Sequence, residues 1–159
     1  MAGRLGSWPP RELDPADVVP GSVGSIMSGT LMTVSINASL EEAQRLMQHY
    51  GIHHLLLEEH GSVVAVVSDR NLVRAIGPLL ANRDEDHVRK RPVFHAAEYH
   101  LVTVHHTTSV EDAAHALLTE EVSSLPVVND ADEMVGMVTS RDMLRELASR
   151  AAEWERLAS

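Results

Sequence analysis

The chain repeats itself, and this feature limits its possible folds more than any other. A shift of 70 residues places Thr33-Val34 on Thr103-Val104 and Ser39 on Ser109. After one inserted residue in a turn, residues 67–72 fall on residues 138–143. A period of this kind identifies a duplicated unit of structure, and it has to be found before single elements are assigned. A unit of about 55 residues buries little apolar surface alone, so the two copies are expected to share a core.

Both halves predict the same order of elements. A short strand (31–35 or 101–105) precedes a helix that begins after Ser39 or Ser109, each followed three residues later by an acidic residue as in a capping box. Two strands rich in Val and Leu come next, and a second helix begins at Ser68 or Thr139. The predicted fold class is α/β (α+β): two β-α-β-β-α repeats packed with pseudo-twofold symmetry.

The repeat also predicts domain boundaries. Residues 1–24, rich in Pro, are expected to form a tail or an arm that lies on a partner, and residues 25–77 form the first repeat. Residues 78–100 are expected to be an extended linker with at most a short helix, because Gly77-Pro78 should end the preceding helix early. Residues 101–159 form the second repeat, whose last helix should run from Ser140 to about Leu157.

Charge and composition exclude several function classes. The 13 basic and 23 acidic side chains give a net charge of −10, which repels phosphodiester backbones, so no nucleic-acid partner is predicted. The absence of cysteine excludes disulfides, thiolate metal sites and cysteine nucleophiles. No apolar run is long enough for a membrane span, and the N-terminus lacks the apolar stretch of a signal peptide. We therefore expect a cytoplasmic protein without membrane contact.

The ends of the third strands carry the most informative polar residues. Ser68 is followed three residues later by Asn71, and Thr139 by Asp142. A hydroxyl at a strand-to-helix turn lies beside exposed backbone N–H groups that suit a phosphate. A carboxylate one turn further on the same side can accept both hydroxyls of a ribose. The same residues are also ordinary helix-start chemistry, so both interpretations stay open on this pattern.

Three stretches together resemble a cystathionine-β-synthase (CBS) domain. They are Met32-Thr33-Val34, residues 124–128 (Ser-Leu-Pro-Val-Val) and residues 136–144, which begin Gly-Met-Val-Thr. Two such domains in tandem resemble a Bateman module, and the resemblance covers about residues 25–149. The Ser-Asp-Arg-Asn-Leu stretch at 68–72 is similar to that of stand-alone pairs of the acetoin-utilisation type.

This resemblance implies a cleft between the repeats that binds an adenosyl ligand such as AMP, ADP, ATP or S-adenosylmethionine. In the family pattern Asp142 holds the ribose, Thr139 meets phosphate, and residues around Ser124, Leu125 and Pro126 flank the base. In the first repeat Asn71 replaces the carboxylate and Leu56 the proline, so the second repeat is predicted to hold the better site. The full set of expected ligand-contacting residues is Thr139, Arg141, Asp142, Ser124, Leu125, Pro126, Thr103, Ser68, Asn71, His54, Leu55 and Thr33.

Ten histidines invite a metal interpretation. The pairs His53-His54 and His105-His106 lack the helical i, i+4 spacing of a zincin motif. Neighbours on a regular strand point to opposite faces, so His53 and His54 should not reach one ion. We therefore predict histidines at the surface or at a pocket rim, and no metal site. The basic run at residues 89–91 either meets ligand phosphates or lies in a solvated loop.

Three functions remain as hypotheses. The first is a non-catalytic regulatory module that binds an adenosyl ligand, signals to an unknown effector protein, and forms a homodimer through its amphipathic helices. The second is a constitutive dimerisation module with a degenerate, empty cleft, which Asn71 and Leu56 favour. The third is a small metal-dependent enzyme that uses the histidines. No catalytic residue or catalytic cofactor is predicted, because no motif with catalytic spacing occurs in the sequence.

Overall fold

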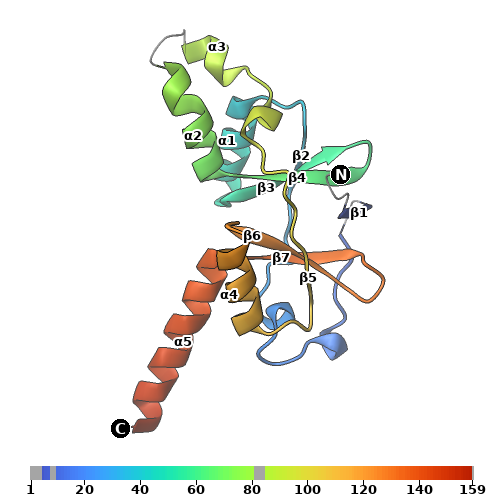
Figure 1. The fold of residues 1–159 in the computed structure, drawn as a ribbon, viewed down its shortest axis with the longest axis vertical. Coiled ribbons are helices and arrows are strands. Elements are labelled where there is room, and N and C mark those ends of the chain that lie inside the picture. The colour runs from blue at the N-terminus through green and yellow to red at the C-terminus, as the bar shows by residue number, and fades with distance from the viewer. Residues whose placement is uncertain (1–4, 8–9, 81–84, 159) are drawn as a thin grey trace. The chain divides into compact units, whose positions relative to one another are not determined.

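The computed structural model describes residues 5–7, 10–80 and 85–158, and it divides the chain into two compact units (Figure 1). The first unit comprises Met1–Trp8 and Leu31–Leu101, and the second comprises Pro9–Thr30 and Val102–Ser159. No helix in the described part of the chain is both long enough and apolar enough to cross a membrane.

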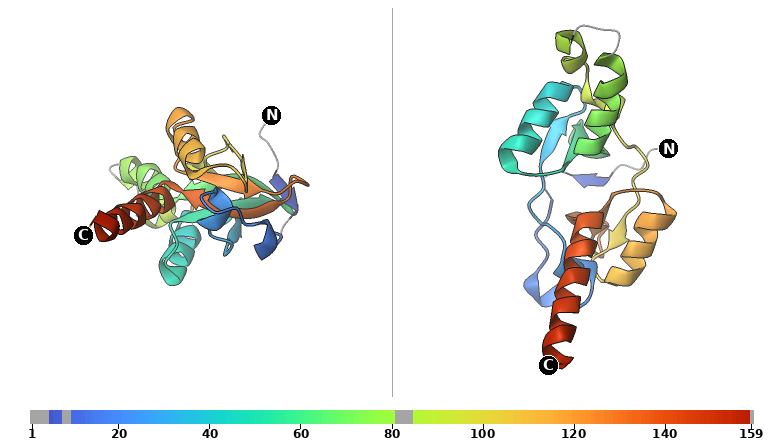
Figure 2. Two further views of the ribbon diagram at one scale, coloured as in Figure 1. Left: turned by 90° about the horizontal axis from the view of Figure 1, so that it is seen from below. Right: turned by 90° about the vertical axis from the view of Figure 1, so that its left-hand side faces the viewer.

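The first unit is a four-stranded sheet with helices on one face (Figures 1 and 2). Its strand order is β1-β4-β3-β2; β2 and β3 are parallel, and the other neighbours are antiparallel. The strands are β1 (Leu5–Ser7), β2 (Thr33–Ser35), β3 (His54–Glu59) and β4 (Ser62–Ser68). The helical elements are α1 (Leu40–Tyr50), α2 (Asp69–Leu80), α3 (Glu85–Arg89) and the 3-10 turn η3 (Val93–Ala96).

The second unit repeats this plan with a three-stranded sheet, in the order β5-β6-β7. The strands are β5 (Val104–His105), β6 (Ser124–Val128) and β7 (Met134–Thr139), and the helices are α4 (Val110–Thr119) and α5 (Ser140–Ala158). Two 3-10 turns, η1 (Pro15–Asp17) and η2 (Val23–Ser25), complete the unit. The predicted β-α-β-β-α order is confirmed in both repeats, and so are the mixed α/β class and the long last helix.

The first helix of each repeat begins as its capping residues predict. The Ser39 hydroxyl accepts a hydrogen bond of 3.0 Å from the backbone N–H of Glu42, and Ser109 accepts one of 3.0 Å from Asp112. Each bond satisfies one of the N–H groups that a helix start leaves without a partner. Helix α1 ends at Gly51, whose φ of 63° lies in the left-handed region that glycine adopts without a steric cost.

Each unit has its own hydrophobic core between the sheet and its helices. Alternate strand residues face this core, as the period of two in a β-strand requires. Leu55 and Leu125 occupy equivalent positions, and both are completely buried. In the first unit the core includes Leu40, Ala43, Met47, Leu57, Ala65 and Val67; in the second it includes Val23, Ala113, Leu117, Val127, Val135 and Val138.

The region around residues 77–100 differs from the expectation of an early helix end. Helix α2 continues through Gly77-Pro78 to Leu80, so the expected stop at this pair is wrong. Helix α2 as a whole contacts α3 and η3, and tertiary packing can override the low helix propensity of Gly and Pro. The segment that follows is also more structured than an extended linker, because Val88 and Val93 are completely buried in it.

The segments that lead into the two repeats are exchanged between the units. Residues 10–30 precede the first repeat but belong to the second unit, where Ser22 bridges to Ser109 and Ser28 to Met137. Residues 92–101 precede the second repeat but belong to the first unit, where Pro92 bridges to Ser39 and Glu98 to Val66. The N-terminal region, expected as an arm on a partner, therefore makes these contacts within its own chain.

Candidate functional site

The second unit places Ser124, Thr139 and Asp142 together where β7 runs into α5. Ser124 pairs with Thr139 across the antiparallel strands β6 and β7. The backbone N–H of Thr139 donates to Oδ2 of Asp142 over 2.9 Å, and the Thr139 hydroxyl donates to the same oxygen over 2.7 Å. The expected partners thus form a helix-start box, with a carboxylate held beside a hydroxyl.

The guanidinium of Arg145 binds the second oxygen of the Asp142 carboxylate. Nη1 of Arg145 donates to Oδ1 of Asp142 over 3.0 Å, and the Asp142 side chain is 14% exposed. A carboxylate has about four acceptor positions, so these three bonds leave it capacity for a further donor. The sequence analysis missed Arg145, although its position three residues after Asp142 on a helix is the spacing of a local ion pair.

The first unit builds the same box from different side chains. The backbone N–H of Ser68 donates to Oδ1 of Asn71 over 2.9 Å, and the Ser68 hydroxyl donates to that same oxygen. His54 pairs with Ser68 across β3 and β4, as Ser124 does with Thr139. Because the amide has only one oxygen, it offers half the acceptor capacity of the carboxylate and no charge.

The first unit also has an ion pair at this turn, which the sequence analysis did not foresee. Nδ1 of His53 lies 2.8 Å from Oδ2 of Asp69, the residue directly after Ser68. Burial raises the pKa of Asp69. Hydrogen bonds from His53 and from the backbone N–H of Arg70 together lower this pKa by more than burial raises it, so it lies below the ordinary value. This turn therefore keeps a negative charge, but outside the box and on an exposed side chain.

The remaining expected site residues divide into available and buried groups. The Leu55 and Leu125 side chains lie in the two cores, so these residues can offer a ligand only their backbone. Pro126 follows Leu125 in the buried strand β6, and Thr33 in β2 pairs with Leu56 in β3. Thr103 and Arg141 are exposed. In the basic run, Nε of Arg89 donates to Glu85 over 2.9 Å, so this guanidinium already has a partner.

Two further features of the second unit lie outside the expected site. A pocket of about 350 Å³ is lined by residues of the N-terminal segment, among them Pro10, Arg11 and Met27, together with Val135. None of the expected ligand residues lines it. Donor atoms of His105, His106 and Asp130 also lie within 4.8 Å of one another, which is the one grouping of possible metal ligands in the described part of the chain.

The fold and the paired boxes define the class to which the chain belongs: a duplicated β-α-β-β-α protein with one hydroxyl and one acceptor at the end of each third strand. The CBS domain model matches residues 23–78 and again residues 93–149. The chain therefore belongs to the CBS domain family, as a tandem pair. The two matches start at Val23 and Val93, which are completely buried members of the two exchanged segments.

Known proteins with this pair are of more than one kind. L-aspartate semialdehyde sulfurtransferase of Methanocaldococcus jannaschii is 27% identical over 124 residues, which cover 77% of this chain but 22% of that protein. The chain thus spans about a fifth of that relative's length. The CBS domain pair of protein MJ0100, solved with 5'-methylthioadenosine and S-adenosyl-L-methionine, has 27% identity and a TM-score of 0.66, covering 81% and 97% of the two chains.

A putative acetoin utilization protein, AcuB of Vibrio cholerae, shares the fold at 20% identity. Its TM-score is 0.64, and the match covers 85% of this chain and 96% of that one. The resemblance to a tandem CBS pair of this type is therefore confirmed at the level of the fold.

Proposed function

We propose that the chain is a non-catalytic regulatory module that binds an adenosyl ligand and passes the bound state to an effector protein in the cytoplasm. The observation that carries this proposal is the Thr139–Asp142 box, in which an ionised acceptor lies beside a hydroxyl at the start of α5. The MJ0100 pair, solved with 5'-methylthioadenosine and S-adenosyl-L-methionine, supports an adenosyl ligand as the class.

The chemistry of the box fits the ribose and phosphate parts of such a ligand. An ionised carboxylate can accept hydrogen bonds from both ribose hydroxyls, and charge-assisted bonds are about twice as strong as neutral ones. The N–H groups at the start of α5 provide donors for a phosphate, and the Thr139 hydroxyl can join them by turning its single proton away from Asp142. The backbone of β6 beside Ser124 offers polar groups for the edge of the base. AMP, ADP, ATP and S-adenosylmethionine all contain the adenosine that this arrangement would recognise.

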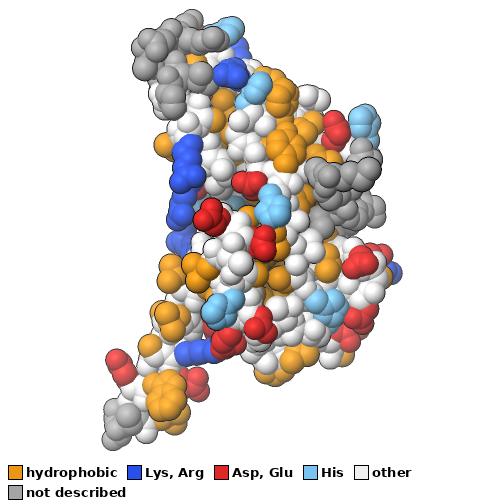
Figure 3. Space-filling model, viewed as in Figure 1, with side chains coloured by type: hydrophobic (Ala, Val, Ile, Leu, Met, Phe, Trp, Pro, Cys, Tyr) orange, Lys and Arg blue, Asp and Glu red, His pale blue; other side chains and the backbone are white. Residues whose placement is uncertain are grey.

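Signalling requires that the ligand binds one arrangement of the module better than another. In our proposal the two repeats pair with pseudo-twofold symmetry, and a homodimer provides the surface that the effector reads. Helix α5 supports this part, because its C-terminal end projects past the other elements of its unit in Figure 1. Four large apolar side chains along it are 66 to 81% exposed: Leu144, Leu147, Trp154 and Leu157. Figure 3 shows hydrophobic side chains on the surface of this helix.

The same exposed face also favours a second candidate function, a constitutive dimerisation module whose cleft binds nothing. Asn71 supports this alternative, because its neutral amide satisfies the helix start with no ionised acceptor in the box. The two candidates make different predictions about ligands but the same prediction about oligomeric state.

Calorimetry and thermal denaturation with AMP, ADP, ATP and S-adenosylmethionine separate them. A ligand at a hundred times its Kd should stabilise the folded protein by about 2.7 kcal/mol. We expect saturable binding of at least one of the four, with a rise in melting temperature. If all four leave both measurements unchanged at millimolar concentration, the regulatory proposal is wrong and the constitutive module stands.

A further inference from the structure

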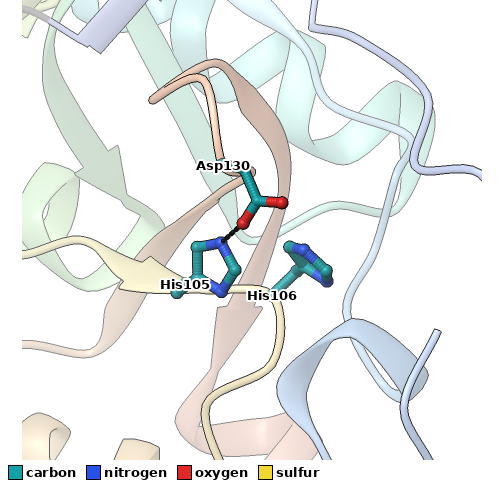
Figure 4. Close-up of side chains that lie close together, drawn as sticks. All are labelled: His105, His106 and Asp130. Atoms are coloured by element: carbon teal, nitrogen blue, oxygen red, sulfur yellow. Dashed lines mark ion pairs between the residues drawn. The ribbon is translucent and has the colours of Figure 1, made fainter. Parts of the chain in front are cut away.

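Two imidazoles and one carboxylate, none of them part of the Thr139–Asp142 box, lie close together in the second unit (Figure 4). His105 is the last residue of β5, His106 follows it, and Asp130 lies in the turn between β6 and β7. Nε2 of His105 lies 2.8 Å from Oδ1 of Asp130. One donor atom from each of the three side chains lies within 4.8 Å of the other two.

His106 is the unusual member of this group. It is 6% exposed, and its Nδ1 has no hydrogen-bond partner among the described residues. Its backbone is fixed on both sides: its N–H donates to the carbonyl of Val128 over 2.9 Å, and its carbonyl accepts from the N–H of Gly24 over 2.9 Å. A buried polar atom without a partner costs free energy, so this nitrogen is in place for a ligand that would occupy it.

The first repeat shows that the fold itself does not need this histidine. At the equivalent positions it has Ser35 and Ile36, and the N–H of Ile36 donates to the carbonyl of Glu58 over 3.0 Å as His106 does to Val128. Ile36 packs against the hydrophobic core of its unit. An aliphatic side chain therefore fills the same backbone position, and the polar atom of His106 calls for a different explanation.

Neighbouring groups orient the other two donors. Nδ1 of His105 lies 2.8 Å from the hydroxyl of Thr107, which leaves Nε2 directed at Asp130. Histidine ligands of metals usually have such a partner on the second ring nitrogen. The turn that carries Asp130 is fixed by Asn129, whose side-chain oxygen accepts the N–H groups of Ala131 and Glu133.

The two adjacent rings meet because the strand ends between them. Alternation to opposite faces holds only along a continuing strand. Since β5 ends at His105, His106 belongs to the turn, and the two ring centroids lie 4.3 Å apart. The expectation that adjacent histidines cannot serve one ion therefore does not apply to this pair.

We propose that His105, His106 and Asp130 bind one divalent transition-metal ion, with Zn²⁺ as the best match. Imidazole and carboxylate ligands suit this ion, which three protein ligands hold with a fourth position open to water. Ligands about 2.0–2.1 Å from a tetrahedral zinc lie roughly 3.4 Å apart, so His105 and Asp130 need to separate slightly and His106 to approach them. This site is independent of the proposed adenosyl ligand, and either can fail without the other.

The test is a titration of the chelator-stripped full chain with Zn²⁺, followed by calorimetry and by long-range ¹H–¹⁵N NMR of the imidazoles. We expect one equivalent of Zn²⁺ to bind with micromolar affinity and to shift the ring nitrogens of His105 and His106. Three variants remove single ligands: His106→Ile and His105→Ser copy the first repeat, and Asp130→Asn changes a side chain that is 93% exposed. Each variant should weaken Zn²⁺ binding by roughly a hundredfold. Loss of a group that only hydrogen-bonds to a metal ligand already costs up to about that much in affinity.

His53→Gln is the matched control, because His53 and Asp69 form a pair with the same 2.8 Å separation. It should leave Zn²⁺ binding unchanged. Because Asp130 is exposed, Asp130→Asn keeps the test valid even if His106→Ile were to fold poorly. Affinity that these ligand variants leave unchanged would assign the ion to other histidines and overturn the proposal. Failure of the wild-type chain to saturate below 100 µM Zn²⁺ would overturn it as well.

Discussion

The strand-to-helix turns of the two repeats are built alike and differ in one charge. In both turns the hydroxyl and the backbone N–H of one residue donate hydrogen bonds to a single side-chain oxygen of the residue three positions later. That residue is Asp142 in one repeat and Asn71 in the other. The neutral amide of Asn71 is enough to satisfy the helix start. The carboxylate of Asp142 therefore provides more than the helix requires, and the excess is an acceptor oxygen and a negative charge.

This difference shows how to separate the fold's needs from those of a ligand. A feature that both repeats share belongs first to the fold, since two cores need it. A feature that only one repeat has needs another explanation. By this criterion Asp142, His106 and the long helix α5 are the positions at which function has to be tested, whereas Arg145 has an equivalent in Arg74 of the first repeat.

The largest effect is expected from Asp142→Ala. An ionised acceptor bond contributes about 1.5–3 kcal/mol, so loss of this carboxylate should weaken adenosyl-ligand binding on the order of a hundredfold. Asn71→Ala removes neutral bonds of about 1 kcal/mol and should weaken binding roughly fivefold. Calorimetry on both folded variants measures the two affinities. If Asp142 only caps the helix, both substitutions lower the melting temperature modestly and leave affinity alone.

A smaller effect, with a cleaner cause, is expected from Asp142→Asn. This change copies the first repeat, so the helix start keeps its acceptor and the melting temperature should stay close to that of the wild type. Affinity should fall about tenfold, because a neutral acceptor bond contributes about 1.4 kcal/mol less than a charge-assisted one. The reverse change, Asn71→Asp, should strengthen binding at the first repeat. A larger loss from Asn71→Ala than from Asp142→Asn would mean that the first repeat holds the main site.

The second helices of the two repeats provide the next comparison. Helix α5 has 19 residues and α2 has 12, and the extra turns carry Trp154 and Leu157 in exposed positions. Leu147→Glu places a charge on this apolar face and should weaken homodimerisation at least about tenfold, since a buried unpaired charge is costly. Ser149→Glu adds the same charge to the opposite side of α5 and should have little effect. Sedimentation velocity would measure both, and a wild-type monomer at micromolar concentration contradicts the dimer.

The smallest effect concerns the outer edge of the third strand of each repeat, which is β4 in the first unit and β7 in the second. A different segment of the chain covers this edge in each unit. Strand β4 pairs with β1, whereas β7 receives a backbone bond of 2.9 Å from Arg11. Arg11 also lies 2.8 Å from Glu133, and its hydrogen bond, together with one from Asn129, lowers the pKa of that carboxyl below the ordinary value. A lowered folded-state pKa stabilises the protein above the ordinary pKa, and this contribution is lost as pH falls through the folded value.

We therefore expect Arg11→Ala to lower the melting temperature slightly at pH 7, and the difference from the wild type to shrink as pH falls through the lowered folded-state pKa of Glu133. Denaturation curves of the two proteins from pH 8 to pH 3 measure the difference. A difference that does not shrink as pH falls would mean that the Arg11 side chain acts through its packing, because alanine keeps the backbone N–H that donates to Met134. The exposed ion pair between His53 and Asp69 in the first unit can be compared with the Arg11–Glu133 pair by the same denaturation curves.

The sequence contained much of the fold because the repeat doubled every signal. Capping serines and strands rich in Val and Leu placed the core elements within a few residues of their observed bounds. The hydroxyl–acceptor pairs were also readable, since they lie three residues apart at a strand end. Positions that depend on long-range contact were missed. One example is the hydrogen bond from the backbone N–H of Arg11 to the carbonyl of Met134. Another is the imidazole of His106, which lies beside that of His105 because β5 ends at His105.

The exchanged leading segments have a consequence for how the molecule is made. Val23 is synthesised well before the rest of the core that it completes, because other members, such as Leu117 and Val138, come roughly a hundred residues later. The core of the first unit is likewise incomplete until Val93 has been synthesised, because Val93 follows all strands of that unit in the sequence. A ribosome adding about 5–20 residues per second therefore holds the early segment exposed for seconds before its binding surface exists. Neither unit is a continuous stretch of chain, so cutting the gene between the repeats leaves two fragments that each lack part of their core.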